Sequence, residues 1–489
     1  MGRPSVEEVI DSLGFGWAQV QYAVLAYGVW MSDGVEVSMV TALTEAIGRE
    51  LGLPGWRMAS LSSILFVGVA IGSGLSGYIG DSYGRRVPCL ASYFGVAFFG
   101  ILSACSCTYT HLVVLRAATG VAMGVGMPAS LALVSETAPA QCRVPLQASR
   151  GVVFAFGNLL AALVLVVDSR NLQNLHWRLG FVLGAVPPMV LGLLAALLLQ
   201  ESPAFLAEAG RHDEARNVLE HMRRLNGHDP DVVSVVYKTT DAQGGRDAAG
   251  GAAPPAPPAP LRWQRQLRVV FGRDLAYSTI TLACCTFMAT FVEYGTAYAE
   301  PRVFQVTHAA LPAGWQLFTK YAVTVPIRVA VLVPAALLGK KRCLVLACSF
   351  GIALGIALFA STGGSFDRSF VQAVVYYGST YLPTVGIALS ILCAFQLSVE
   401  IYPTAARATG CASCVTLGRF GAVAAPFVYE FSSVWQRFYW IMACLAIGTA
   451  ILCTFLPDHY NSTLLAGQHV GDAEEGRTKM REAEPLLSK

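Results

Sequence analysis

The chain has 489 residues, of which 54% are hydrophobic and only 13% charged, and its mean hydropathy is +0.53. An average soluble domain carries about 25% charged residues, so this composition excludes a soluble globular protein. The formal net charge of +3 gives no sign of a nucleic-acid partner, and we expect a lipid bilayer around most of the chain.

Apolar segments, taken in chain order, predict twelve membrane-spanning helices, because apolar runs of about 18 residues or more can cross a bilayer. The first six lie near residues 18–44, 58–80, 87–108, 112–136, 146–168 and 179–199. The second six lie near residues 274–298, 315–338, 343–362, 371–398, 408–430 and 438–456. We therefore predict an all-α membrane protein with an N-terminal half at 18–199 and a C-terminal half at 272–457.

Polar segments flank and join these two halves. Residues 1–17 and 458–489 form the tails, and residues 200–271 form a linker that starts as a surface helix and then becomes rich in proline and glycine. Loops on the side of the tails collect more Lys and Arg than the opposite loops. Since positively charged loops face the cytosol, we predict that both termini and the linker are cytosolic.

A short charged motif occurs once in each half. Glu136 and Arg143 lie in SETAPAQCR, and Glu400 and Arg407 lie in SVEIYPTAAR with the same internal spacing. Each copy follows a long apolar stretch. Two hydrophobic halves with one motif in matching places predict an internally repeated membrane transporter.

A glycine-rich basic loop follows the second predicted span, in the string GDSYGRR. It contains Gly80, Asp81, Gly84, Arg85 and Arg86. This string resembles the G-D-x-x-G-R-R/K loop signature of the major facilitator superfamily. The resemblance implies a fold of twelve helices in two six-helix pseudo-repeats, with a cytosolic gate formed by this loop and the repeated motif. The corresponding segment of the second half, 338–342, lacks the aspartate, so the implied gate is not symmetric.

Further strings narrow the resemblance to one branch of that superfamily. They are WMSDGVE at 30–36, ESPAFL at 201–206, EIYPTAARATG at 400–410 and LGRFG at 417–421. In this order they are similar to the branch of synaptic-vesicle-related proteins, bacterial niacin transporters, and organic anion and cation transporters. The sugar-porter string that would follow the sixth span is absent, which makes sugar the less favoured substrate.

Carboxylates inside the predicted spans are the candidates for proton coupling, because a charge in the membrane is costly. Asp33 and Glu36 lie one turn apart on nearly the same face of the first span. Two carboxylates in a low dielectric repel each other, which suits a proton-coupling site. The alternative for each is a fixed ion pair with an arginine of another span. Glu293 in the seventh span is a second protonatable group or a gate residue.

Two arginines within the spans are candidates for substrate binding. Arg419 lies in the eleventh span, where the resemblance to anion-transporting members implies contact with the negative charge of a substrate. A guanidinium can bind a carboxylate through two hydrogen bonds; the alternative is a structural pairing with Glu430. Arg328 follows Pro326 in the eighth span, so it binds substrate or satisfies the carbonyl groups that this proline frees.

Aromatic side chains offer a further, less specific signal. Tyr376 and Tyr377 in the tenth span and Phe287 and Phe291 in the seventh can stack on a flat ring. Helix packing is the alternative for each of them.

These features predict a secondary active transporter of a small organic anion, such as an aromatic carboxylate of the nicotinate type. We expect a monomer in the plasma membrane or an intracellular vesicle membrane that works by alternating access, with protons as the candidate coupling ion. The alternatives are an organic cation or sugar transporter and a non-transporting solute-binding protein on the same fold. The sequence contains no HExxH, GxSxG or phosphate-loop motif and no metal-ligand spacing, so we expect no enzyme activity, cofactor or metal.

Overall fold

A computed structural model describes residues 4–229, 237, 268, 270–272, 275–307, 311–337, 341–362, 370–401, 407–432 and 434–454. In this part of the chain the structure is all helical. The Pro/Gly-rich part of the linker and the C-terminal tail lie outside the described residues.

The N-terminal half begins with a short helix and continues with long ones. They are α1 (Val6–Leu13), α2 (Trp17–Leu51), α3 (Gly55–Tyr83), α4 (Arg86–Ala104), α5 (Tyr109–Thr137), α6 (Arg143–Asp168), α7 (Trp177–Gly184) and α8 (Val186–Leu198), with a 3₁₀ turn η1 (Ala140–Cys142) before α6. Two linker helices follow, α9 (Pro203–Glu208) and α10 (His212–Leu225). They lie where the sequence predicts a surface helix, and α10 buries Val218, Leu219 and Met222 together with Arg223, which pairs with Glu220 of the same helix.

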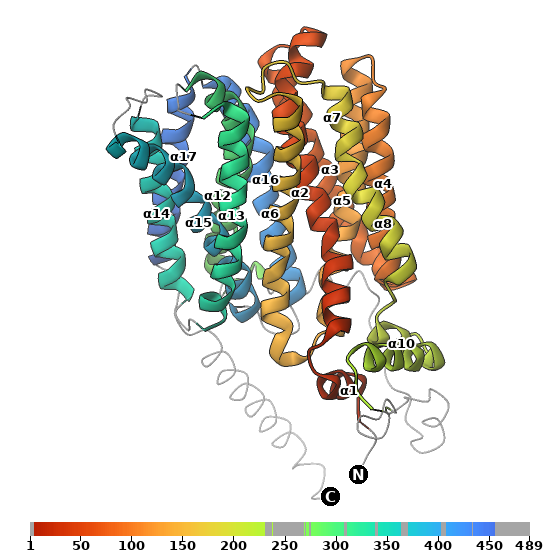
Figure 1. Ribbon diagram of the computed structural model, residues 1–489. Helices are drawn as coiled ribbons and strands as arrows, with labels where there is room; N and C mark the ends of the chain where they lie inside the picture. Colours follow the sequence, from red (N-terminus) through yellow and green to blue (C-terminus); the bar gives the residue numbers. More distant parts are fainter. Residues whose placement is uncertain are drawn as a thin grey trace, which may run out of the picture.

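The C-terminal half repeats the pattern of long helices. Its helices are α12 (Ala276–Val306), α13 (Ala313–Leu337), α14 (Lys341–Ser361), α15 (Phe370–Ile401), α16 (Arg407–Phe431) and α17 (Trp435–Thr454). In Figure 1 the two halves stand side by side with their helices roughly parallel to one axis, and α1 and α10 lie together at one end. We call that end the cytosolic end, in line with the predicted orientation.

Each predicted span lies on a helix or helix pair of the structure. Among the described residues, seven segments combine the length and hydropathy of membrane spans: α3, α4, α5, 145–168 of α6, the α7–α8 pair at 177–198, α12 and α17. The chain is therefore an all-helical, multi-pass membrane protein. That all twelve spans cross the membrane with cytosolic termini stays a prediction.

Two details differ from the predicted spans. The sixth span is not one continuous helix: it breaks at Ala185 into α7 and α8, because Pro187 and Pro188 occupy the first turn of α8, where a missing N–H is tolerated. The first and seventh spans are longer than predicted. α2 continues to Leu51 and α12 to Val306, which brings Glu45 and Glu300 into helices.

Helices within the N-terminal half pack closely through glycines. Where α3 crosses α5, an added Cβ on Gly68 or Gly72 would lie 2.3 or 2.1 Å from a carbonyl oxygen of α5. In the same way, an added Cβ on Gly120 or Gly124 of α5 would lie 2.1 or 2.2 Å from a carbonyl oxygen of α3. Small residues let helix backbones approach in a membrane, where dispersion rather than water drives association.

The two halves meet along two seams. α6 packs against α13, as Figure 1 shows, and α3 packs against α16. Ser63 of α3 donates a hydrogen bond to the carbonyl of Val423 in α16 at 2.7 Å. At the end away from the cytosol, Gln305 of α12 donates to Glu45 of α2 at 3.2 Å, so the lengthened helices hold the halves together there.

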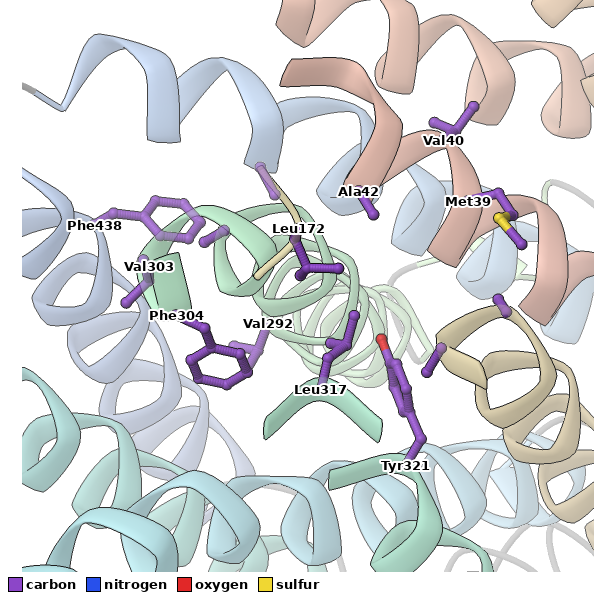
Figure 2. Packing of buried hydrophobic residues seen from close by; sticks show 14 of the residues in the cluster. Met39, Val40, Ala42, Leu172, Val292, Val303, Phe304, Leu317, Tyr321 and Phe438 are labelled. Carbon is purple, nitrogen blue, oxygen red and sulfur yellow. The ribbon is translucent and has the colours of Figure 1, made fainter. Parts of the chain in front are cut away.

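The loop between α6 and α7 closes this outer end. Leu172 is only 1% exposed and belongs to a hydrophobic cluster with residues of both halves; Figure 2 labels it together with other members of this cluster, such as Phe304 and Leu317. Its φ of 57° is in the left-handed region, which costs a non-glycine residue about 1–2 kcal/mol. Gly314 of α13 donates to the carbonyl of Arg170 at 2.9 Å, which fixes the loop to the C-terminal half.

Candidate functional site

A cavity lies between the two halves and encloses about 460 Å³ of space not filled by atoms, its open side included. Residues of α2 and α6 line it from the N-terminal half, and residues of α12, α13 and α15 line it from the C-terminal half. They are Val37, Phe154, Asn158, Glu293, Tyr294, Thr296, Ala297, Lys320, Tyr321, Thr324, Arg328, Thr384 and Ile387. A site at the interface of repeated halves is where transporters of this kind hold their solutes.

Glu293 and Arg328, both predicted site residues, line this cavity and form an ion pair with each other. Arg328 Nη2 lies 2.7 Å from Glu293 Oε1, and its Nη1 donates to the carbonyl of Gly151 in α6 at 3.2 Å. The guanidinium also stands 5.5 Å from the ring centroid of Phe154. Arg328 thus bonds a carbonyl of the opposite half, which is not the role that Pro326 suggested.

Arg419 and Asp33 lie behind Tyr294, a residue of the cavity wall. Arg419 Nη1 donates to the hydroxyl of Tyr294 at 2.9 Å, and its Nη2 contacts Met127 Sδ at 3.5 Å. Both of these partners are uncharged. Asp33 is 0% exposed, and neither of its carboxylate oxygens has a hydrogen-bond partner among the described residues. The charges of Asp33, Arg419 and Glu293 interact with one another.

Glu36 has a different environment from Asp33, although the two lie on the same helix. Arg116 of α5 is fully buried and its Nη1 lies 2.7 Å from Glu36 Oε2. The guanidinium also donates to Ser103 Oγ and stacks 4.4 Å from the ring centroid of Phe181. Glu36 is therefore held in an ion pair with an arginine of another helix, which was the alternative prediction, and it does not line the central cavity.

Three charged residues near the cavity were missed by the sequence analysis. Arg150 of α6 stands 5.1 Å from the ring centroid of Trp30, and its charge interacts with those of Arg328, Arg419 and Glu293. Lys320 of α13 forms a buried ion pair with Glu300 of α12. Arg150 and Lys320 were visible as basic residues inside predicted spans. Glu300 was hidden because the seventh span was predicted to end before it.

The four predicted aromatic residues lie outside this cavity. Phe287 and Phe291 stack on each other at 6.0 Å between ring centroids, and Phe291 is buried in the core. Tyr376 donates to Gln316 at 2.8 Å, and Tyr377 stacks on Tyr381 at 6.3 Å. These contacts fit the packing alternative, and a substrate contact for these residues stays a prediction.

The predicted gate residues of the first half converge at the cytosolic end. Arg85 bonds Asp81 at 2.7 Å and Glu136 at 3.2 Å, which joins the glycine-rich loop to the repeated motif. Arg143 lies 3.4 Å from Glu7 of α1. The corresponding residues of the second half, Glu400 and Arg407, have side chains outside the described residues.

A third motif, ESPAFL at 201–206, contacts the same group of residues through Glu201. The backbone N–H groups of Arg85 and Arg86 donate to Glu201 at 2.8 and 3.0 Å, so this carboxylate caps the N-terminus of α4. Gly84 has a φ of 93°, and a Cβ there would lie 2.2 Å from Glu201 Oε2, which explains the glycine. Arg86 also donates to the carbonyl of Ala196 at 2.7 Å, and Gly80 accepts the N–H of Gly84 at 3.1 Å.

Two packed helical halves around a central charged cavity define a multi-pass membrane carrier. Residues 21–468 match the family model "Sugar (and other) transporter". The chain belongs to this family of the major facilitator superfamily, whose members are transporters rather than enzymes.

Relatives and solved structures agree with this assignment. The synaptic vesicle 2-related protein of Rattus norvegicus is 26% identical over 476 residues, 92% of this chain and 80% of that protein. The organic cation/carnitine transporter 7 of Arabidopsis thaliana is 24% identical over 87% of this chain and 88% of its own length. The inward-open xylose transporter XylE of E. coli has a TM-score of 0.69 at 17% identity, covering 90% of this chain and 96% of that one, which shows the same fold.

Proposed function

We propose that the protein is a secondary active transporter of a small organic anion, of the aromatic carboxylate type. The solute binds in the cavity between the halves, and alternating access around it moves the solute across the membrane. Both termini and the linker face the cytosol, and twelve spans cross the bilayer.

The charge around the cavity is the observation that carries this proposal. Arg328 is paired with Glu293, and the pairs Glu300–Lys320 and Glu36–Arg116 are balanced within themselves. Arg419 differs from these residues, because it is partly buried and its hydrogen-bond partners, Tyr294 and Met127, are uncharged. A charge away from water is costly unless it is paired. An organic carboxylate would give Arg419 a hydrogen-bonded partner of opposite charge.

Arg419 is the anchor that we assign to the solute. Its hydrogen-bond partners among the described residues are uncharged, so it can form two parallel bonds to a carboxylate without breaking a bonded ion pair. Arg328 is already paired with Glu293, and we assign it a supporting role on the cavity wall.

Asp33 is the proton-coupling residue in this proposal. Its oxygens lack hydrogen-bond partners among the described residues, so a proton can reach or leave it without breaking a fixed contact. We assign no coupling role to Glu36, because Arg116 pairs with it, and Glu293 is the second candidate.

A second candidate function is transport of an organic cation. Asp33 favours it, because a buried carboxylate without a partner is a counter-charge for a cation. The name of the Arabidopsis thaliana relative also includes an organic cation. Arg419 disfavours it, because its hydrogen-bond partners are uncharged and it would repel a second cation.

Uptake by proteoliposomes separates the two candidates. Full-length protein should accumulate radiolabelled nicotinate when an inward proton gradient is imposed, and Arg419→Ala protein should not. Uptake of tetraethylammonium that persists in the Arg419→Ala protein, with no nicotinate uptake by the unmodified protein, would replace the anion proposal with the cation one.

A further inference from the structure

A second cavity lies within the C-terminal half, directly beside the central one. It lies between α12, α13, α14, α15 and α17 and has about 300 Å³ of space not filled by atoms, its open side included. Thr296, Lys320, Thr384 and Ile387 line both cavities, so the two are neighbours that share one wall.

Two buried polar atoms on its wall have no partner. Glu300 uses Oε1 to bond Lys320, while its Oε2 is buried and unpartnered among the described residues. The hydroxyl of Tyr439, on the same cavity, is also buried and unpartnered there. Because buried polar groups are nearly always hydrogen-bonded in folded proteins, each of these atoms indicates a missing ligand group.

Three other hydroxyls of the wall are restricted to accepting. Ser379 and Thr380 both donate to the carbonyl of Tyr376, at 2.9 and 2.8 Å. Thr296 donates to the carbonyl of Val292 at 2.8 Å. Since a hydroxyl has one hydrogen, these oxygens can only accept a further bond. The wall therefore presents several acceptors, and its donors include the Tyr439 hydroxyl and the ammonium of Lys320, which has three hydrogens and bonds Glu300 with one.

We propose that this cavity is a second solute subsite for a neutral group that both donates and accepts hydrogen bonds, namely a hydroxyl or an amide. The proposal rests on the proposed function, because the same solute carries the carboxylate that Arg419 binds. Glu300 Oε2 accepts from the group and Tyr439 donates to it. Lys320 is paired with Glu300 and neutralises it, so a protonated amine would gain little and meet a like charge. The transported solute is then a hydroxy or amide derivative of a small carboxylic acid.

Ligand-induced stabilisation of the purified full-length protein tests this subsite directly. The probes are benzoate, its 3- and 4-hydroxy and 3- and 4-carbamoyl derivatives, and 4-(aminomethyl)benzoate. At least one hydroxy or carbamoyl isomer should bind about tenfold more tightly than benzoate, since it satisfies buried groups that benzoate leaves unpaired. The aminomethyl compound should bind no more tightly than benzoate.

Tyr439→Phe is the diagnostic variant, because it removes one unpartnered hydroxyl and little volume. In it, the preference for the best hydroxy or carbamoyl isomer over benzoate should fall to about threefold or less. Tyr22→Phe is the matched control: Tyr22 also has a buried, unpartnered hydroxyl, but it lines neither cavity, so the full preference should remain.

The outcomes separate this subsite from the proposed function. If benzoate stabilises the protein in an Arg419-dependent way but all derivatives bind equally, the subsite is refuted and the anion site stands. Tightest binding of the aminomethyl compound would refute a neutral-group subsite. If no acid stabilises the protein, both the proposed function and the subsite fail.

Discussion

The two halves of this carrier treat their buried ion pairs in different ways. In the N-terminal half, Glu36 and Arg116 contact Ser103 and Phe181, and they line neither the central cavity nor the second cavity. In the C-terminal half, Glu293–Arg328 and Glu300–Lys320 both join α12 to α13 and line cavities. Burial and pairing are common to all three pairs, so neither property alone marks a functional charge.

What differs is whether a pair leaves polar atoms unsatisfied beside open space. Glu300 Oε2 and Arg328 Nε are buried without partners among the described residues, whereas no atom of Glu36 or Arg116 is in that state. From this difference we expect that the N-terminal pair stabilises its half and that the C-terminal pairs take part in solute binding. Substitutions in either half can test this expectation.

The largest expected effect is on folding, at the N-terminal pair. Arg116→Met leaves Glu36 buried without a counter-charge and should lower the free energy of unfolding by about 3–5 kcal/mol. The double variant Glu36→Gln/Arg116→Met should recover most of the loss, because no charge is left unpaired. Thermal unfolding of the detergent-purified proteins measures both.

Lys320→Met supplies the matched measurement in the C-terminal half. Glu300 then faces a cavity that water can enter, so the loss of stability should be clearly smaller than for Arg116→Met. Equal losses in the two variants would remove the distinction between the halves.

An intermediate effect is expected at Asp33, on coupling rather than on folding. Asp33→Asn removes a charge that accepts no hydrogen bond among the described residues, so the protein should fold normally. Gradient-driven nicotinate uptake should fall to the level seen without a proton gradient, as measured in proteoliposomes. Retained gradient dependence would move the coupling role to Glu293.

The sequence was sufficient to predict the helices and to name two residues that line the central cavity, Glu293 and Arg328, but not the pairing of charges. Hydropathy and the repeated motif predicted two helical halves, because a bilayer allows little else. The partner of Glu36 could not be identified, since Arg116 lies on another helix and the contact depends on helix rotation. In the sequence, Asp33 and Glu36 are both carboxylates within the first predicted span. Only the packing of the helices shows that Glu36 has an arginine partner and that Asp33 has no hydrogen-bond partner among the described residues.

Because some predicted span ends were wrong, one charged residue beside the central cavity was not recognised. Glu300 lies in the last turns of α12, which continue past the predicted span end at 298 and contain Pro301. The break at Ala185 was missed because the prolines after it lie within an uninterrupted apolar run. The unpartnered Tyr439 hydroxyl has no signal in the sequence.

The smallest expected effect concerns Leu172, where the outer ends of the halves meet. Leu172→Ala and Leu172→Gly remove the same buried contacts, but glycine adopts a φ of 57° without steric strain. The glycine variant should therefore be the more stable of the two by about 1 kcal/mol in thermal unfolding. An alanine variant equal to or more stable than the glycine variant would show that the left-handed backbone is not strained.

The most direct test of the account is the equilibrium binding of nicotinate to purified protein, with and without Arg419. Removing a partly buried, hydrogen-bonded charge from a binding site costs about 2 kcal/mol or more, so Arg419→Ala should weaken binding by a factor of about thirty or more. The Tyr22→Phe protein should bind as tightly as the unmodified chain. Nicotinate affinity that does not change in Arg419→Ala would contradict the claim that this arginine anchors an organic anion between the halves.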